Sequence, residues 1–125
     1  QGKGLEKPKN SVSTIPIALQ TNIGSVAGQF TNNNTLDFIV AAKKPGFEQA
    51  DLYLYAGNGA GQFPKNRKIG SIPCALQTGV SLTAGDFDGD GDTDVLANAK
   101  RPDYEEAKTY LFFNKGSGNF SLTND

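Results

Sequence analysis

Residues 84–95 read AGDFDGDGDTDV, with an aspartate at every second position from 86 to 94. Carboxylates crowded at alternate positions repel one another unless a cation lies between them, and Ca²⁺ takes about six to eight oxygen ligands. Gly91 stands at the sixth position counted from the first aspartate, where a calcium loop turns sharply. We expect a main-chain carbonyl ligand from Asp92 and side-chain ligands from Asp86, Asp88, Asp90 and Asp94.

Two other interpretations of this stretch are weaker. An EF-hand loop needs a bidentate glutamate at its twelfth position, which is Ala97 here, and a helix on each side. A solvated acidic turn without metal rarely places acids at alternate positions. Magnesium also suits the stretch less well than calcium, because it tolerates less ligand crowding and gives up its waters reluctantly. The aspartates therefore predict calcium as the cofactor.

An internal repeat extends outward from this loop. Residues 15–21 read IPIALQT, and residues 72–78, which lie 57 positions later, read IPCALQT. The same offset continues without a gap to Phe63 and Phe120, and 20 of the 49 aligned positions are identical. Such self-similarity indicates a duplicated structural unit. The chain divides into a flexible tail over residues 1–10, a first repeat over 11–67 and a second repeat over 68–125.

The first repeat keeps the loop but not its carboxylates. Its five corresponding positions hold Gln29, Thr31, Asn33, Thr35 and Asp37. A single carboxylate would neutralise a divalent ion poorly. We predict that this loop is metal-free and is held by hydrogen bonds between its Asn and Thr side chains and its own backbone.

Each repeat is expected to contain four short strands. Compact runs of β-branched, aromatic and aliphatic residues alternate with polar or Gly-rich turns, and no segment shows a sustained helical period. A four-stranded unit of this length is the size of one propeller blade, so the expected fold class is all-β. The predicted strands cover 25–30, 37–42, 51–55 and 68–75, then 82–87, 94–99 and 108–112, with 11–18 as a further fourth strand.

Residues 84–95, followed by a strand and by the pattern Gly116-x-Gly118-x-Phe120, resemble the FG-GAP (VCBS-type) repeat. That family includes the integrin α-subunit propeller and several propeller lectins. The resemblance implies a β-propeller with calcium on the loop between the first two strands of a blade. It does not imply a particular ligand, because the family includes adhesion receptors, lectins and accessory domains of enzymes.

Two blades do not close a ring, since most propellers have about four to eight. Residues 11–18 have a fourth-strand sequence, whereas the chain stops at Asp125, where another fourth strand would begin. One chain could therefore complete the last blade of its neighbour, head to tail, in a homo-oligomer of about three or four copies. The alternative is a pair of blades that belongs to a longer propeller.

Both repeats carry the same loop between their second and third strands, with the pattern Lys-(Lys/Arg)-Pro-x-(Phe/Tyr)-Glu. In an up-and-down blade this loop lies on the face opposite the calcium loop. A cation, an aromatic ring and a carboxylate could bind a glycan or protein ligand by stacking and directed hydrogen bonds. The alternative is that proline and the aromatic ring stiffen the hairpin while the charges pair in solvent. The connection from the fourth strand of one repeat to the first strand of the next shares this face and contains Gln77. The candidate ligand-binding residues are therefore Lys43, Phe47, Glu48, Gln77, Lys100, Tyr104 and Glu105.

The composition narrows the class of function. Histidine is absent and Cys74 is the one cysteine, so common acid–base groups and thiolate metal clusters are missing within one chain. A net charge of −1 implies neither a nucleic-acid surface nor a membrane surface, and no apolar run is long enough to span a bilayer. The start at Gln1 instead of methionine indicates a trimmed amino terminus, either by removal of a signal peptide or by the choice of the expressed segment, and we expect a secreted protein.

These features predict a calcium-stabilised extracellular binding or adhesion module, of which a carbohydrate-binding propeller lectin is one form. The alternative is a fragment or accessory domain of a larger secreted enzyme or receptor. Catalysis is disfavoured, because the acids that could serve glycoside hydrolysis are better used by calcium and no nucleophile–base pair is visible. We therefore expect a protein that is not an enzyme.

Overall fold

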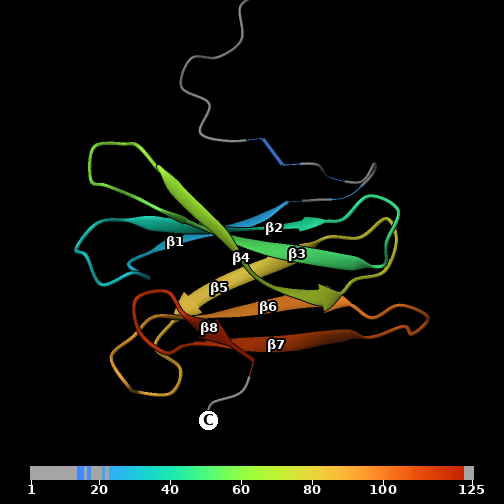
Figure 1. The fold of residues 1–125 in the computed structure, drawn as a ribbon. Helices are drawn as coiled ribbons and strands as arrows, with labels where there is room; N and C mark the ends of the chain where they lie inside the picture. The colour runs from blue at the N-terminus through green and yellow to red at the C-terminus, as the bar shows by residue number, and fades with distance from the viewer. Residues whose placement is uncertain (1–13, 16, 18–20, 22, 123–125) are drawn as a thin grey trace, which may run out of the picture.

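Two antiparallel four-stranded sheets, stacked on one another, make up the fold (Figure 1). The computed structural model describes residues 14, 15, 17, 21 and 23–122. Each sheet is an up-and-down meander, since every strand pairs with the next along the chain. The first sheet contains β1 (Gly24–Gly28), β2 (Asp37–Lys43), β3 (Gln49–Ala56) and β4 (Lys65–Pro73), and the second contains β5 (Val80–Gly85), β6 (Asp94–Lys100), β7 (Ala107–Asn114) and β8 (Phe120–Ser121).

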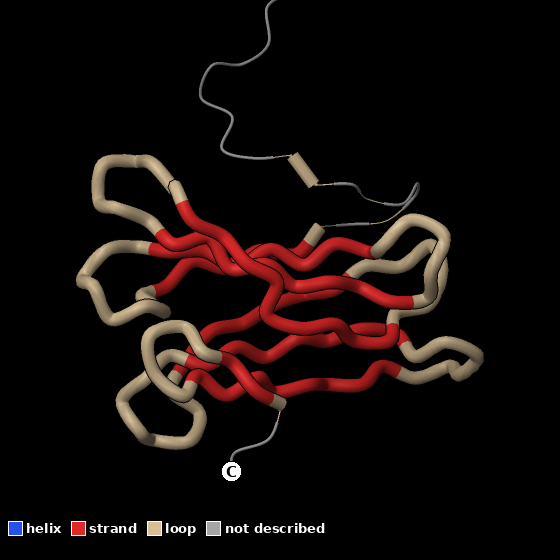
Figure 2. The backbone as a smooth tube through the Cα atoms, in the orientation of Figure 1, coloured by secondary structure: helices blue, strands red, loops and turns tan. Residues whose placement is uncertain are grey.

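The sheets confirm the all-β class and the internal repeat. Gly28 pairs with Asp37 in the first sheet, and Gly85 pairs with Asp94 at the equivalent point of the second. No helix occurs among the described residues, so none there could span a membrane. The loops gather at the two ends of the strands, as Figure 2 shows.

Some predicted strand ends are displaced for identifiable reasons. β1 ends at Gly28 rather than at residue 30, because the Phe30 amide turns toward the carboxylate of Asp37. β4 starts at Lys65 rather than at residue 68, because its first residues still pair with the end of β3. β4 also belongs to the first sheet, so the sheets are out of phase with the sequence repeats 11–67 and 68–125. The strand predicted over 11–18 falls mostly outside the described residues.

The core lies between the two sheets. Alternate residues of the facing strands are fully buried there, including Ile39 and Leu52 of the first sheet and Val95 and Ala97 of the second. Burial of each large aliphatic side chain contributes about 1.5–3 kcal/mol. Cys74 is also buried in this core, as expected for a small strand-end residue.

The first strands of the two sheets approach each other very closely. A Cβ atom at Gly24 would lie 2.2 Å from the carbonyl oxygen of Val80, so only glycine permits this spacing of β1 and β5. Near the end of the same strands, Phe30 packs against Phe120, with ring centroids 5.9 Å apart. The packing therefore brings the loop after β1 against the second sheet.

Candidate metal centre

The loop between β5 and β6 is anchored at its last residue, Asp94. This carboxylate is fully buried; its Oδ2 atom accepts a hydrogen bond from the Phe87 amide at 2.9 Å, and its Oδ1 atom accepts one from the Asn114 amide at 2.8 Å. Asp94 therefore joins the end of β5, the start of β6 and the end of β7. A buried carboxylate requires such donors, so these bonds hold both ends of the loop together.

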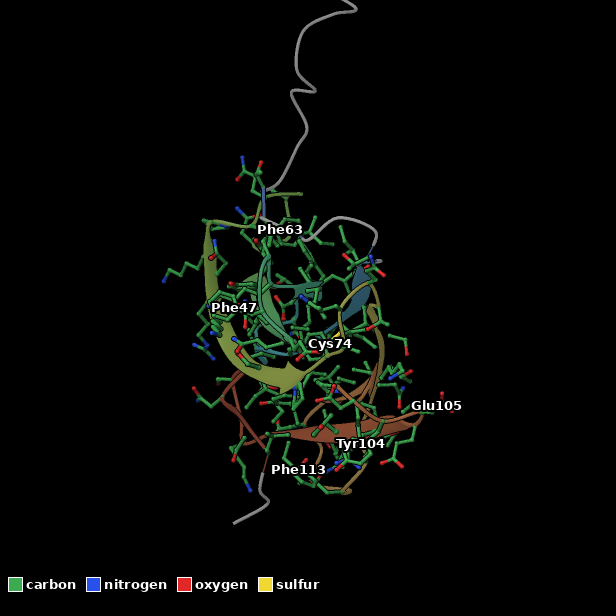
Figure 3. The ribbon with its side chains drawn as sticks, turned by 90° about the vertical axis from the view of Figure 1, so that its right-hand side faces the viewer. Phe47, Phe63, Cys74, Tyr104, Glu105 and Phe113 are labelled. Carbon is green, nitrogen blue, oxygen red and sulfur yellow. The ribbon has the colours of Figure 1, made fainter. Side chains whose placement is uncertain are left out.

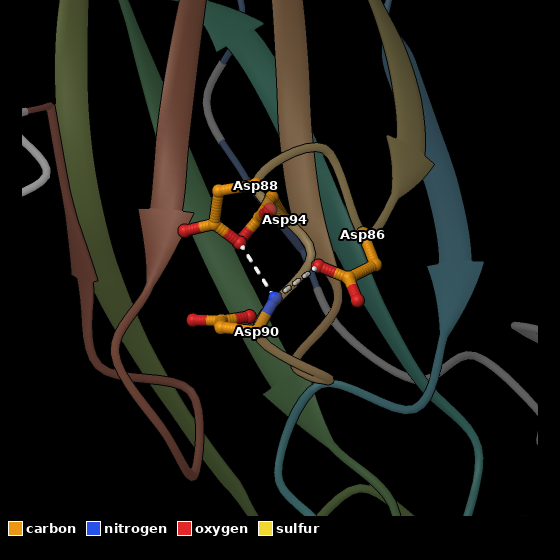
Figure 4. A group of neighbouring side chains, drawn as sticks. All are labelled: Asp86, Asp88, Asp90 and Asp94. Atoms are coloured by element: carbon orange, nitrogen blue, oxygen red, sulfur yellow. Dashed lines mark hydrogen bonds between the residues drawn. The ribbon is translucent and has the colours of Figure 1, made fainter.

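Four aspartate side chains of this loop converge on one another. Asp86 and Asp90 are exposed, Asp88 is half-buried, and one carboxylate oxygen from each of these and from Asp94 lies within 4.8 Å of the others. Ca²⁺–oxygen distances are about 2.3–2.6 Å, so oxygens on opposite sides of one ion are about 5 Å apart. The four oxygens could therefore hold a single metal ion. Figure 4 shows the carboxyl groups around a common space, with the Asp90 amide donating to Asp86 and Asp88.

Backbone amides fold the loop around Asp86. Its Oδ2 atom accepts from the Gly91 amide at 2.8 Å, and its Oδ1 atom accepts from the amides of Gly89 at 2.9 Å and Asp90 at 3.1 Å. The Gly91 bond contributes most to lowering the pKa of Asp86; desolvation opposes it, and the other two amides add to it. Gly89 and Gly91 have φ angles of 76° and 91°, which favour glycine.

Negative charge is crowded at Asp88. Desolvation raises the pKa of this carboxyl group most, followed by a side-chain hydrogen bond with Asp90; repulsion from Asp94 and Asp90 acts in the same direction. Residues 86–94 include no lysine or arginine that could balance this charge. The electrostatics of the loop therefore favour a bound cation.

The fifth aspartate, Asp92, lies outside the converging group. Its Oδ1 atom accepts a hydrogen bond from Nδ2 of Asn32, 3.3 Å away in the first repeat. The side chain is thus directed toward the neighbouring loop, and the main-chain carbonyl of Asp92 stays the predicted ligand atom.

The corresponding loop of the first sheet has the same anchor and a different interior. Asp37 accepts hydrogen bonds from the amides of Phe30 at 2.9 Å, Thr31 at 3.0 Å and Gly57 at 2.8 Å. Within the loop, the Thr35 amide and the hydroxyl groups of Thr31 and Thr35 donate to Oδ1 of Asn33. The predicted hydrogen bonding between polar side chains and the loop backbone is therefore present.

Family profiles match most of the chain. The profile of the FG-GAP-like repeat matches residues 10–97, and that of the FG-GAP repeat matches residues 78–119. The chain belongs to the FG-GAP repeat family. A search of curated proteins finds no match. FG-GAP repeats are found in adhesion, integrin-like and propeller proteins, and the two stacked sheets are consistent with two propeller blades.

The two FG-GAP repeats are joined beside the aspartate loop by Asn114, which the sequence reasoning missed. Its Nδ2 atom donates to the carbonyl oxygens of Phe30 and Thr93, each at 2.9 Å. Its Oδ1 atom accepts from the amides of Gly116 and Gly118 at 2.9 and 3.1 Å. Asn114 is fully buried and links both loops. Its replacement of the glycine found at the equivalent position of the first FG-GAP repeat is the signal that could have identified it.

At the other end of the FG-GAP repeats, the β2–β3 and β6–β7 loops are closed by their own lysines. Lys43 is fully buried, and its Nζ atom donates to the carbonyl oxygens of Lys44, at 3.0 Å, and of Phe47. Lys100 donates in the same way to Arg101, at 3.1 Å, and to Tyr104. Both predicted ligand-binding lysines thus point inward, toward the main-chain carbonyl oxygens of their own loops.

The aromatic rings of these two loops lie at the surface. Phe47 is 53% exposed and Tyr104 is 52% exposed. Nζ of Lys44 lies 4.3 Å from the Phe47 ring centroid, and Cζ of Arg101 lies 3.9 Å from the Tyr104 ring centroid. The side chains of Glu48 and Glu105, on the same loops, are also exposed.

The connection between the sheets brings these two loops together. The amide of Cys74 donates to the carbonyl oxygen of Glu48 at 3.1 Å, and that of Ala75 donates to the carbonyl oxygen of Lys100 at 3.0 Å. Gln77 lies on the same connection in a left-handed conformation, with φ at 62°. All seven candidate ligand-binding residues are therefore at the end opposite the aspartates, and Figure 3 shows Phe47 and Tyr104 with Cys74 between them.

Proposed function

We propose that the chain is a calcium-stabilised extracellular binding module and not an enzyme. The observation that carries this proposal is the separation of two kinds of site. Four aspartates converge at one end, whereas two copies of an aromatic loop flank the inter-sheet connection at the other. The first end stabilises the fold, and the second presents a surface to a ligand.

Calcium is the proposed ion because every side chain in the converging group offers an oxygen and the group has the span of one Ca²⁺ site. The bound ion supplies the positive charge that residues 86–94 lack. Asp86, Asp88 and Asp90 would bind it with side chains that have little other role in the core. Asp94 would bind it while keeping its two backbone donors, so the ion and the strand ends would be tied to one carboxylate.

The proposed ligand is a glycan or a protein that stacks on Phe47 and Tyr104. About half of each side chain is exposed, which leaves ring surface for an incoming apolar face. Glu48 and Glu105 can add directed hydrogen bonds from the same loops. Lys43 and Lys100 act indirectly in this proposal, because they hold the loops in shape.

A glycan array probed with the fluorescently labelled protein in calcium tests the carbohydrate form of the proposal. We expect binding that is lost in a Phe47→Ala, Tyr104→Ala double variant. The matched control is Leu36→Ala, which removes a side chain that is 60% exposed at the opposite end. Glycan binding that survives the double variant would place the site elsewhere, and an array without any bound glycan would contradict a lectin function.

A further inference from the structure

Equivalent positions of the two repeats have very different surroundings. Val80 is 6% exposed, whereas Ile23, its equivalent in the first repeat, is 60% exposed. Phe30 is 0% exposed and packs on Phe120, whereas its equivalent Phe87 is 45% exposed. The internal interface between the sheets thus buries one copy of each position and leaves the other copy on an outer face of the molecule.

The outer face of the first sheet, called face A, has the composition of a covered sheet. A groove of about 480 Å³ on this face is lined by apolar side chains that include Ile15, Ile23, Phe38 and Val40. Their equivalents in the second repeat are all buried in the core: Ile72, Val80, Val95 and Ala97. Face A is therefore equivalent to the inner face of the second sheet, on which the first sheet packs within the chain.

The outer face of the second sheet is called face B. It is equivalent to the inner face of the first sheet, which packs on the second sheet within the chain. Its apolar residues include Phe87, Leu96 and Leu111. Their equivalents, which form part of the buried inner face of the first sheet, are Phe30, Ile39 and Leu54.

Face B also carries polar groups that are already hydrogen-bonded. The Thr109 hydroxyl group donates to Oδ1 of Asn98, and Nδ2 of Asn98 donates to the Ser81 hydroxyl group at 3.4 Å. Because these groups have partners within the face, covering them would cost less free energy than burying unpaired polar groups. The side chains of Ser81, Asn98 and Thr109 can therefore be covered without new polar partners.

We propose that face A of one chain packs on face B of a second copy, head to tail, in the same orientation as the internal sheet-to-sheet contact. A second copy is the proposed occupant because face B offers residues equivalent to those that cover the counterpart of face A within the chain. About three or four copies would place six or eight blades around an axis. This assembly goes beyond the proposed function and depends on neither the metal nor the glycan.

One position makes the contact between copies differ from the internal contact. Ser81 stands at the position equivalent to Gly24, whose missing Cβ lets the carbonyl oxygen of Val80 approach. The two copies must therefore be spaced more widely at this point, where Ser81 of one copy lies beside Ile23 of the next. This pair gives the assembly a specific test.

Light scattering over a wide concentration range, in calcium, is the first experiment. We expect the wild-type chain to reach three or four times its 13.2 kDa mass and Ile23→Glu to remain at 13.2 kDa. Ala60→Glu, at an exposed residue of the β3–β4 turn, should behave as the wild type. A wild-type chain that stays at 13.2 kDa at every concentration, or an Ile23→Glu variant with the wild-type mass, would overturn the proposal.

A charge-pair rescue identifies the two faces. We expect the Ile23→Glu, Ser81→Lys double variant to regain at least half of the assembled fraction that Ile23→Glu loses, because the new charges meet between copies. Failure of this rescue would overturn the assigned packing, while circular dichroism confirms that each variant is folded. Calcium titration of the same samples separates this proposal from the metal site, since a monomer that binds calcium contradicts only the assembly.

Discussion

The loops after β1 and β5 share a buried aspartate and two left-handed backbone positions, but they differ in the side chains of their interiors. Both end on a buried aspartate, and both have two left-handed residues at matching positions: Asn32 and Asn34 in the first, Gly89 and Gly91 in the second. Inside the first loop, threonine hydroxyl groups donate hydrogen bonds to an asparagine side chain, whereas four carboxylates converge inside the second loop. The terminal aspartate and the two left-handed residues are thus common to both loops, whereas the further carboxylates occur only in the loop that could hold a metal ion.

The largest effect is expected from removal of the terminal aspartates. Asp37→Ala leaves three backbone amides without their acceptor, and Asp94→Ala leaves two. In chelator, we expect losses in the free energy of unfolding of about 3 kcal/mol and about 2 kcal/mol, respectively. Urea denaturation measures both. Asp37→Asn, which keeps one acceptor oxygen, should lose less than Asp37→Ala, and a loss below about 1 kcal/mol in Asp37→Ala would contradict the anchoring role.

Calcium removal should have the next largest effect, and only through the second loop. An ion at about 100 times its dissociation constant adds about 2.7 kcal/mol of stability. We expect chelator to lower the melting temperature of the wild type and Asp88→Ala to remove most of that response. Thr31→Ala, the matched change in the first loop, should keep the response in full. A melting temperature that is the same with calcium and with chelator would contradict a structural role of the ion.

Grafting the acidic pattern onto the first loop tests whether its shape suffices for metal binding. A variant with Gln29, Thr31, Asn33 and Thr35 all replaced by Asp should bind two calcium ions instead of one, because the backbone already has the required turns. Isothermal titration calorimetry measures the stoichiometry. In chelator the graft should be about 1–2 kcal/mol less stable than the wild type, since hydrogen bonds are lost and like charges are added. A stoichiometry of one would show that shape alone is insufficient.

The smallest effect concerns the left-handed residues themselves. Asn34 has a φ angle of 60°, a conformation that costs most residues about 1–2 kcal/mol and costs glycine little. We expect Asn34→Gly to change stability by less than about 0.5 kcal/mol, and Asn34→Ala to destabilise by about 1 kcal/mol. Equal stabilities of the two variants in urea denaturation would contradict the importance of this conformation.

The positions of the strands and of the aspartate loop were predictable because the same sequence pattern occurs in both repeats. β2 begins at residue 37 and β6 at residue 94, as expected from compact apolar runs that each start with an aspartate. The four converging carboxylates follow from their spacing, which is a property of one loop. Sequence spacing could therefore place these elements before any contact between the sheets was known.

Contacts between segments that are distant in the sequence were not predictable in the same way. The bond from Asn114 to the carbonyl oxygen of Phe30 depends on how the sheets stack, so the change from Gly57 to Asn114 between the repeats marks the residue but not its partner. The direction of Lys43 is a similar case, since the pattern of the loop fits an outward cation as well as an inward one. Side-chain direction at Asp92 likewise depends on Asn32 of the other repeat.

In the β2–β3 and β6–β7 loops, inward-pointing lysines hold the backbone, and other side chains point outward and can vary. Lys43 and Lys100 tie their loops to main-chain oxygens, which every residue type provides, so the loop shape does not depend on the outward side chains. Evolution or an engineer can therefore exchange the displayed residues, as the pairs Gly46/Asp103 and Phe47/Tyr104 already do, without rebuilding the hairpin. Under the proposed binding function, each sheet then presents its own pair of side chains on the same loop backbone.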